Sequence, residues 1–214
     1  MGLTQPLPPE ANIDRLAQTL AKWQHRWTAE WHLAAERPRP KSPLAVVVHE
    51  QHQRNFDLWH EEDKARAPNA DDPTIAAVKR RIDKLNQHRN DLVEQLDDYF
   101  FRMIVQRHAP DASAQPWNTE TPGSCIDKLS ILSLKVFHME EQAKRTDVDE
   151  NHREKCRVRA EVLTRQRDDL TTAMQQLLDD LMSGRRQMKL YRQFKMYNDP
   201  TLNPEIYGAE KGKS

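Results

Sequence analysis

Side chains that can bind a polar ligand and move a proton recur along residues 55–66 of this 214-residue chain. They are spaced by three and four residues, which places them on one face of a helix. The set is Asn55, Trp59, Glu62, Asp63 and Arg66. In a pocket, this face would offer Glu62 or Asp63 as a general base. The alternative is a salt-bridge network, or a helix face that simply meets water.

A second polar set lies in residues 79–90 and flanks an apolar series with a seven-residue repeat. Its members are Lys79, Asp83, Asn86 and Asn90. The apolar series consists of Ile75, Val78, Ile82, Leu85, Leu92, Leu96, Tyr99 and Met103. Arg89 interrupts this series and should therefore point inward. Its positive charge must then pair with a carboxylate such as Glu62 or Asp63, bind an anionic ligand, or reach solvent through an extended side chain. If the two helices are antiparallel neighbours, both polar sets meet inside a helical bundle.

A third candidate site is the start of a helix near residue 121. Thr121 is suited to cap the helix and Pro122 to occupy its first position, which leaves the amides of Gly123 and Ser124 free. Such a helix start can bind a phosphate or carboxylate group. Further polar candidates surround it: Asn118, Glu120, Asp127 and Lys128. The alternative is an ordinary capped helix start.

The fourth candidate is the basic segment 185–198, which contains five basic residues and no acidic one. Three aromatic residues lie among them, a pattern that suits phosphate contact with ring stacking, or docking on an acidic partner. The candidate ligand contacts are Arg192, Lys195 and Asn198. The alternative is a terminal helix that packs Leu190, Phe194 and Tyr197 onto the bundle.

Composition excludes several function classes. The chain has only five glycines and contains no Gly-rich phosphate loop, dinucleotide fingerprint or GxSxG elbow. Its 33 basic and 33 acidic residues argue against a general nucleic-acid binder. The densest apolar run, Leu44–Val48, is too short to span a membrane, and no basic and apolar leader opens the chain. We therefore expect a cytoplasmic protein in which Cys125 and Cys156 are reduced.

No metal site or other cofactor is predicted from the spacing of the possible ligands. His49 and His52 lie one turn apart, as do Asp149 and His152. A di-metal bundle requires Glu-x-x-His on two helices together with further carboxylates, and this motif is absent from the sequence.

The apolar periodicity predicts an all-α fold, an antiparallel bundle of four to five long helices with a short basic C-terminal helix. The expected helices cover about 11–36, 43–67, 73–108, from 122 onward, a long stretch to about 183, and 185–198. Either Asp147 or Asp149 should cap the long helix that ends near 183. Asp72 should cap the third of them and Ser42 the second. The stripe of Trp23, Trp27 and Trp31 is expected to pack rather than to stack on sugar rings. Gly123 and Gly184 adjoin helix ends, where we would first look for a ligand.

We expect one helical-bundle domain over residues 11–198, with a flexible tail at 1–10 and a second tail at 199–214. The proline-containing stretches between the helices are short, so neighbouring helices should be antiparallel.

Four motifs together resemble an uncharacterised bacterial family known as domain of unknown function 4254. They lie at 55–66, at 82–91, at 118–124 with 127–132, and at 191–200, and the likeness covers about residues 49–207. The resemblance implies a gene neighbourhood of glycosyltransferases for lipopolysaccharide or other surface glycans, and it carries over no catalytic residue. Members often have arginine where this chain has Lys128. Lysine carries a single ammonium group in place of the planar guanidinium, so it cannot form the same two parallel hydrogen bonds to an anion.

These observations favour a protein that assists surface-polysaccharide biosynthesis by binding an anionic sugar-linked ligand or a glycosyltransferase. One alternative is an enzyme that acts on a phosphorylated or nucleotide-linked sugar, with Glu62 or Asp63 as base and Arg89, Lys128 and Arg192 holding the anion. The other is a structural bundle that forms a homodimer.

Overall fold

The computed structural model describes residues 13–33, 39–107, 115–193, 201–205 and 208. These residues form one short 3-10 helix, Ile13–Arg15, and five α-helices. The α-helices are α1 (Leu16–Leu33), α2 (Pro43–Ala65), α3 (Asp72–Arg107), α4 (Pro122–Lys144) and α5 (Glu150–Met182). No strand occurs in the described part of the chain, so the all-α prediction is confirmed.

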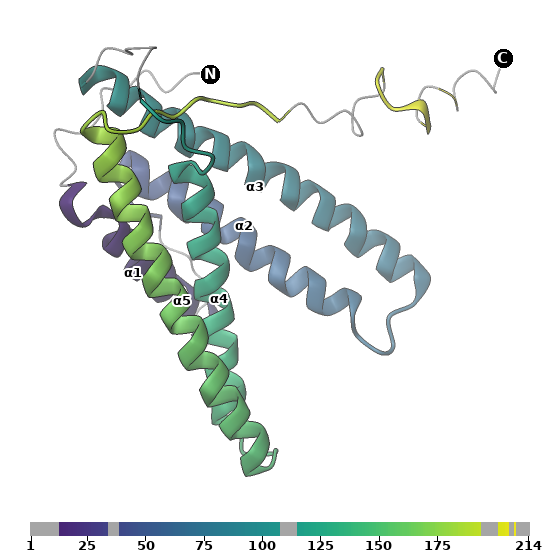
Figure 1. Ribbon diagram of the computed structural model, residues 1–214. Helices are drawn as coiled ribbons and strands as arrows, with labels where there is room; N and C mark the ends of the chain where they lie inside the picture. The colour runs from purple at the N-terminus through teal and green to yellow at the C-terminus, as the bar shows by residue number, and fades with distance from the viewer. Residues whose placement is uncertain (1–12, 34–38, 108–114, 194–200, 206–207, 209–214) are drawn as a thin grey trace.

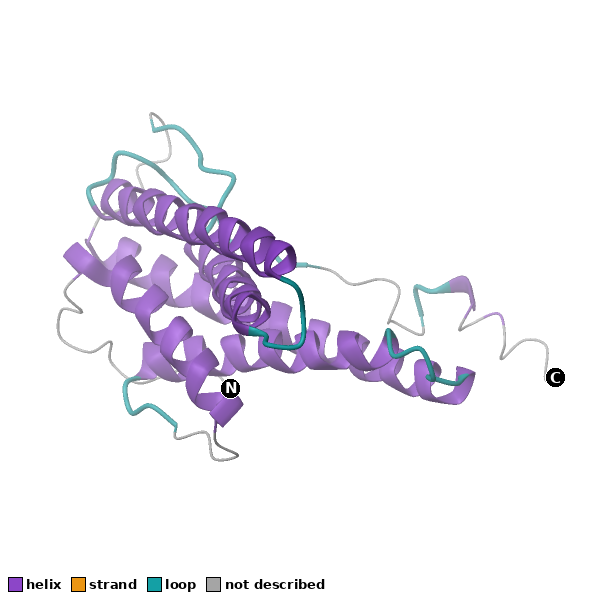
Figure 2. Cartoon of the chain, turned by 90° about the horizontal axis from the view of Figure 1, so that it is seen from below, coloured by secondary structure: helices purple, strands orange, loops and turns teal. Residues whose placement is uncertain are grey.

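Two helical hairpins form most of the molecule. α2 packs mainly on α3 and α4 packs mainly on α5, while α1 lies against α4 and α5. Figure 1 shows the hairpins diverging from a shared end, with the connection between α2 and α3 far from the connection between α4 and α5. Figure 2 shows the helices from below and the loops that join them. Residues of α2 line hollows on more than one side of this helix.

The main core lies where the two hairpins and α1 meet, and it includes Leu20, Leu96, Ile126 and Leu178. Trp27 and Trp31 are buried in this core and stack with their ring centroids 6.3 Å apart. The prediction that the tryptophan stripe packs is therefore confirmed for these two residues. Farther along the α2–α3 hairpin, a small apolar cluster forms around Leu58 and Val78.

Local sequence signals fix most helix ends. Ser42 caps α2 through a hydrogen bond that its hydroxyl accepts from the amide of Ala45, and Pro43 occupies the first helical position. The cap of α3 lies one residue before the predicted one, because the Asp71 carboxylate accepts the hydrogen bond from the amide of Thr74 (2.9 Å). α5 ends at Met182 with Ser183 as its cap, and the next residue, Gly184, has a φ of 73°, which favours glycine.

The predicted basic helix is wrong for its described part. Residues 185–193 are not helical. The backbone of Gln187 instead pairs with the 116–118 loop, accepting from the amide of Asn118 (3.1 Å) and donating to the carbonyl of Pro116 (3.2 Å). Met188 is buried, and Arg192 bonds to Glu94 and Asp98 of α3. These contacts provide hydrogen-bond partners for the extended backbone and pair its charges. The segment therefore stays extended and does not form the helix that the local sequence favours.

Some of the predicted segments and site residues are not among the residues that the structure describes. The predicted N-terminal tail, part of the 199–214 tail, and residues Phe194, Lys195, Tyr197 and Asn198 lie outside the described residues. None of the described helices is both long and apolar enough to cross a membrane.

Candidate functional site

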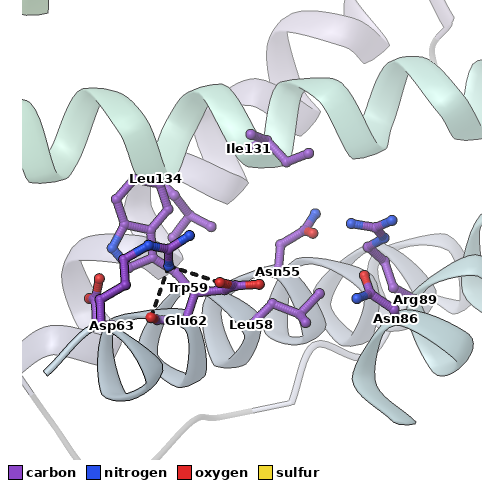
Figure 3. A pocket seen from close by; sticks show the side chains of 10 residues that line it. Asn55, Leu58, Trp59, Glu62, Asp63, Asn86, Arg89, Ile131 and Leu134 are labelled. Carbon is purple, nitrogen blue, oxygen red and sulfur yellow. Dashed lines mark hydrogen bonds and ion pairs between the residues drawn. The ribbon is translucent and has the colours of Figure 1, made fainter. Parts of the chain in front are cut away.

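The polar faces of α2 and α3 come together in a pocket of about 450 Å³ that α4 closes from the side. Six of the predicted site residues line this pocket: Asn55, Glu62, Asp63, Arg66, Asn86 and Arg89. Leu58 and Trp59 of α2 complete the lining, with Ile131 and Leu134 of α4. Figure 3 shows Asn86 and Arg89 side by side on one wall, opposite the α2 side chains. The antiparallel pairing expected of the two helices therefore builds a mixed polar and apolar site.

Arg89 points inward as its position in the repeat predicts, and its side chain is 25% exposed. Its nearest carboxylate belongs to Asp127 of α4, not to Glu62 or Asp63 of α2 as we expected. The distance from Arg89 Nε to Asp127 Oδ1 is 3.8 Å, too long for a hydrogen bond. Among the described residues, the guanidinium makes one hydrogen bond, of 3.5 Å to the Asn90 side chain, and Nε is buried without any. Arg89 thus keeps donors for a ligand.

Asp127 is held in place by two amides of α2. Its Oδ1 accepts hydrogen bonds from the side chains of Gln51 (2.6 Å) and Asn55 (2.9 Å). The same Asn55 amide group donates to the hydroxyl of Ser130 (2.9 Å). One carboxylate oxygen therefore lies close to two amides and a guanidinium. Asp127 does not line the pocket itself, but it contacts Asn55 and Arg89, whose part of the lining we call the inner end.

A buried chain of hydrogen bonds supports that inner end from behind. Ser130 bonds to His52 Nδ1 (2.7 Å), and His52 Nε2 bonds to the hydroxyl of Thr28 on α1 (2.9 Å). The Thr28 hydroxyl donates its own proton to the carbonyl of Gln24 (2.9 Å), so Nε2 of His52 must be the donor in their contact. This network links α1, α2 and α4. Sequence reasoning missed it, although the spacing of Gln51 and Asn55 on one helix, with Asp127 and Ser130 on another, was a usable signal.

The two candidate bases lie at the outer rim. Glu62 forms an ion pair with Arg66 (2.8 Å), and the side chains are 44% and 69% exposed, respectively. Arg66 also donates to the backbone carbonyl of Glu62 (2.8 Å). Asp63 is exposed and lines a neighbouring groove as well. A carboxylate engaged by an arginine in water is poorly arranged for proton abstraction, because it must first give up its partner.

That neighbouring groove lies between α2, α4 and α5 and has a volume of about 660 Å³. Trp59 lines both it and the pocket. The indole stacks on the imidazole of His138, with ring centroids 4.6 Å apart and planes 8° from parallel. Trp59 is therefore held in one orientation at the border between the two hollows.

Several predicted site residues do not reach the pocket. Asp83 pairs with Lys79 on an exposed face of α3, and Lys128 pairs with Glu120 (2.7 Å) beside the start of α4. Asn118 donates to the carbonyl of Glu120 (2.7 Å). Arg192 is bound to α3, as described above. The enzyme alternative requires Arg89, Lys128 and Arg192 to hold one anion together, but Lys128 and Arg192 do not line the pocket that Arg89 lines.

The start of α4 already holds a carboxylate, and it comes from α3. The amide of Gly123 donates to Asp97 Oδ1 (2.7 Å), while Thr121 and Ser124 form a reciprocal capping box. Burial raises the pKa of Asp97 from 3.8 to about 6. A β-carbon at Gly123 would lie 2.6 Å from both Asp97 Oδ1 and the Val93 carbonyl oxygen. Glycine therefore allows close packing of α4 on α3, and the predicted anion site is filled from within the chain.

Comparisons with known proteins give a family and nothing more specific. No curated protein and no solved structure matches the chain. The family model described as "Protein of unknown function (DUF4254)" matches residues 45–190. This range contains the pocket and the first three motifs of the resemblance, whereas the fourth, at 191–200, lies beyond it. Because the match spans more than half of the 214 residues, the chain belongs to the DUF4254 family.

Proposed function

We propose that the pocket between α2, α3 and α4 binds an anionic sugar-linked ligand, and that the protein thereby assists lipopolysaccharide or other surface-polysaccharide biosynthesis in the cytoplasm. The observation that carries the proposal is that the Arg89 guanidinium has few hydrogen bonds. Its guanidinium lies in the pocket wall, 3.8 Å from the nearest carboxylate, with one long hydrogen bond. An arginine with free donors in a concave site is suited to a phosphate or carboxylate, which it can bind through two parallel hydrogen bonds.

The rest of the lining suits a sugar. Asn86 offers an amide donor and acceptor, and Glu62 can accept hydrogen bonds from hydroxyl groups at the rim. Asn55 offers its amide oxygen as an acceptor, because its N–H groups already donate to Asp127 and Ser130. Leu58 and Trp59 add apolar surface, which sugar rings contact with their C–H faces. A volume of about 450 Å³ lies within the usual range for small-ligand sites. The pocket therefore fits a sugar phosphate, or the sugar end of a nucleotide sugar.

Binding is favoured over catalysis by the arrangement of the carboxylates. Glu62 is paired with Arg66, and Asp127 accepts two amide hydrogen bonds and does not line the pocket. The link to surface glycans comes from the family resemblance, which implies genes beside glycosyltransferases. A glycosyltransferase is accordingly the protein partner that we propose would receive the ligand.

The first test is to identify the small molecules that the purified full chain retains. The protein is denatured and the released molecules are analysed by mass spectrometry, with heat-treated protein passed through the same purification as a control. Recovery of sugar phosphates or nucleotide sugars supports the proposal. Recovery of neutral or cationic molecules alone contradicts it.

A second test uses thermal shifts. Nucleotide sugars and sugar phosphates should raise the melting temperature in a concentration-dependent way, and the corresponding neutral sugars should do so much less. Equal shifts with charged and neutral sugars would contradict a site built around Arg89.

A further inference from the structure

Three histidines from three helices converge beside the groove, although no sequence motif connects them. They are His32 of α1, His60 of α2 and His138 of α4. One ring nitrogen from each lies within 4.8 Å of the other two. The ring centroids are 4.9 Å apart for His32 and His138, and 5.3 Å and 5.8 Å apart for the pairs with His60. The planes of each pair are inclined by 63° to 81°, so the rings approach one another from different directions.

Hydrogen bonds orient two of these imidazoles through their Nδ1 atoms. His32 Nδ1 lies 2.7 Å from the backbone carbonyl of Thr28, which can only accept, so this nitrogen carries the proton. His138 Nδ1 lies 2.7 Å from a carboxylate oxygen of Glu141. In both rings, Nε2 is therefore left with its lone pair. Both Nε2 atoms are buried and have no hydrogen-bond partner among the described residues.

Aromatic packing explains only part of this arrangement. His32 stacks on Phe137 with centroids 4.2 Å apart, and His138 stacks on Trp59. Packing alone, however, leaves two buried nitrogen lone pairs unsatisfied in the same cluster, which costs free energy. A metal ion would satisfy both.

We propose that His32, His60 and His138 bind a divalent transition-metal ion, and that Zn²⁺ is the ion that this ligand set fits best. Three neutral imidazoles with one further position open are an established ligand set for Zn²⁺. The carbonyl of Thr28 and the carboxylate of Glu141 supply the outer hydrogen bonds that ligating histidines usually make. Zn–N bonds of about 2.0–2.1 Å in tetrahedral geometry place the ligand nitrogens roughly 3.3 Å apart, so the rings turn slightly inward on binding.

The groups around the three histidines favour the binding of a divalent cation. All three histidines are half-buried. The carboxylates of Asp57, Asp63 and Glu141 lie near enough to act on these rings. The ion can enter through the groove of about 660 Å³, whose wall includes His138. This inference is independent of the proposed pocket ligand.

The sequence predicted no metal, because each ligand comes from a different helix and lies far from the others in the chain. The single local signal is the spacing of His138 and Glu141, which puts an acceptor one helical turn after a histidine.

The test is a metal titration of the full chain after treatment with a chelator. Co²⁺ replaces Zn²⁺ in such sites and gives a visible absorption band when its coordination is tetrahedral. We expect one Co²⁺ per chain, displaced by Zn²⁺. His60→Ala and His138→Ala should lose this binding, while His88→Ala, which removes an exposed histidine of α3, should retain it. Circular dichroism checks that each variant is folded.

Glu141→Gln tests the orienting hydrogen bond without removing a ligand. We expect one ion per chain, bound about 10- to 100-fold more weakly. Because Glu141 is exposed, this variant should fold even if a histidine variant does not. Absence of binding by the parent chain overturns the proposal. The proposal is also overturned if folded His60→Ala and His138→Ala bind the ion as tightly as the parent chain does. If neither of these variants folds, it is overturned when Glu141→Gln binds the ion as tightly as the parent chain.

Discussion

Arg89 of α3 and Asp127 of α4 face each other across the inner end of the pocket at 3.8 Å, near enough to attract but too far to form a hydrogen bond. The carboxylate makes its hydrogen bonds to amides of α2, and the guanidinium therefore keeps most of its donors. Because this ion pair contains no hydrogen bond, an anion can bind the guanidinium without first displacing a hydrogen-bonded carboxylate.

Replacing Asp127 should strengthen anion binding. In Asp127→Asn the amide oxygen can still accept from Gln51 and Asn55, while the negative charge beside Arg89 is lost. We expect several-fold tighter binding of inorganic phosphate and of nucleotide sugars, measured by calorimetry. Unchanged or weaker binding by a folded variant would show that the anion does not approach Arg89.

Gly123→Ala should destabilise the fold. The new methyl group would lie 2.6 Å from the Val93 carbonyl oxygen, so α4 must move away from α3. We expect a loss of about 1–3 kcal/mol in the free energy of unfolding, from denaturant titration. Gly208→Ala is the matched control, since nothing lies within 4 Å of a β-carbon there. Equal stability of the two variants would contradict the close packing.

Asp97 should make stability depend on pH in mildly acidic solution. Burial raises its pKa from 3.8 to about 6, so the folded chain holds this proton more tightly than the unfolded chain does. The contribution of Asp97 to the free energy of unfolding is therefore largest below about pH 4 and declines as the pH rises to about 6.

Asp97→Asn should remove this component of the pH profile, whereas Asp169→Asn, at an exposed position of α5, should leave it in place. The free energy of unfolding at a series of pH values measures both. A profile in which Asp97→Asn and Asp169→Asn cannot be distinguished would contradict the assignment.

Arg192→Ala should release the segment after α5 without greatly changing global stability. The ion pairs of Arg192 with Glu94 (3.2 Å) and Asp98 (2.6 Å) are partly exposed, and such pairs contribute about 0–1 kcal/mol. We expect faster amide hydrogen exchange around Gln193, whose amide also bonds to Glu94, and a nearly unchanged unfolding midpoint. Unchanged exchange at Gln193 would show that other contacts hold the segment.

Local signals predicted the helices well because the helix ends are encoded locally. Pro43 and Pro122 stand at the first positions of α2 and α4, and Gly184 directly follows the cap of α5, as we expected from their backbone preferences. The segment 185–193 was predicted wrongly because its partners, the 116–118 loop and the acidic face of α3, are far away in sequence. Tertiary contacts there overcome the local preference for a helix.

The candidate site was predictable to the extent that it follows from helical periodicity. Spacing placed Asn55 and Glu62 on one face and Asn86 beside Arg89, and α2 and α3 do pair. The partner of Arg89 could not be predicted, because the rotation and axial offset of α4 relative to α3 decide that Asp127 is nearest. The same limit applies to His32, His60 and His138, which three separate helices bring together.

The most direct test of the central claim compares two arginines of α3. Arg89 lines the pocket, whereas Arg80 is exposed and does not. Arg89→Gln and Arg80→Gln remove the same charge from the same helix, and calorimetry measures how each binds a nucleotide sugar that stabilises the parent chain. We predict a loss of roughly 10- to 100-fold in affinity for Arg89→Gln, the equivalent of one charged hydrogen bond, and little change for Arg80→Gln. Equal affinities of the two variants would contradict the account.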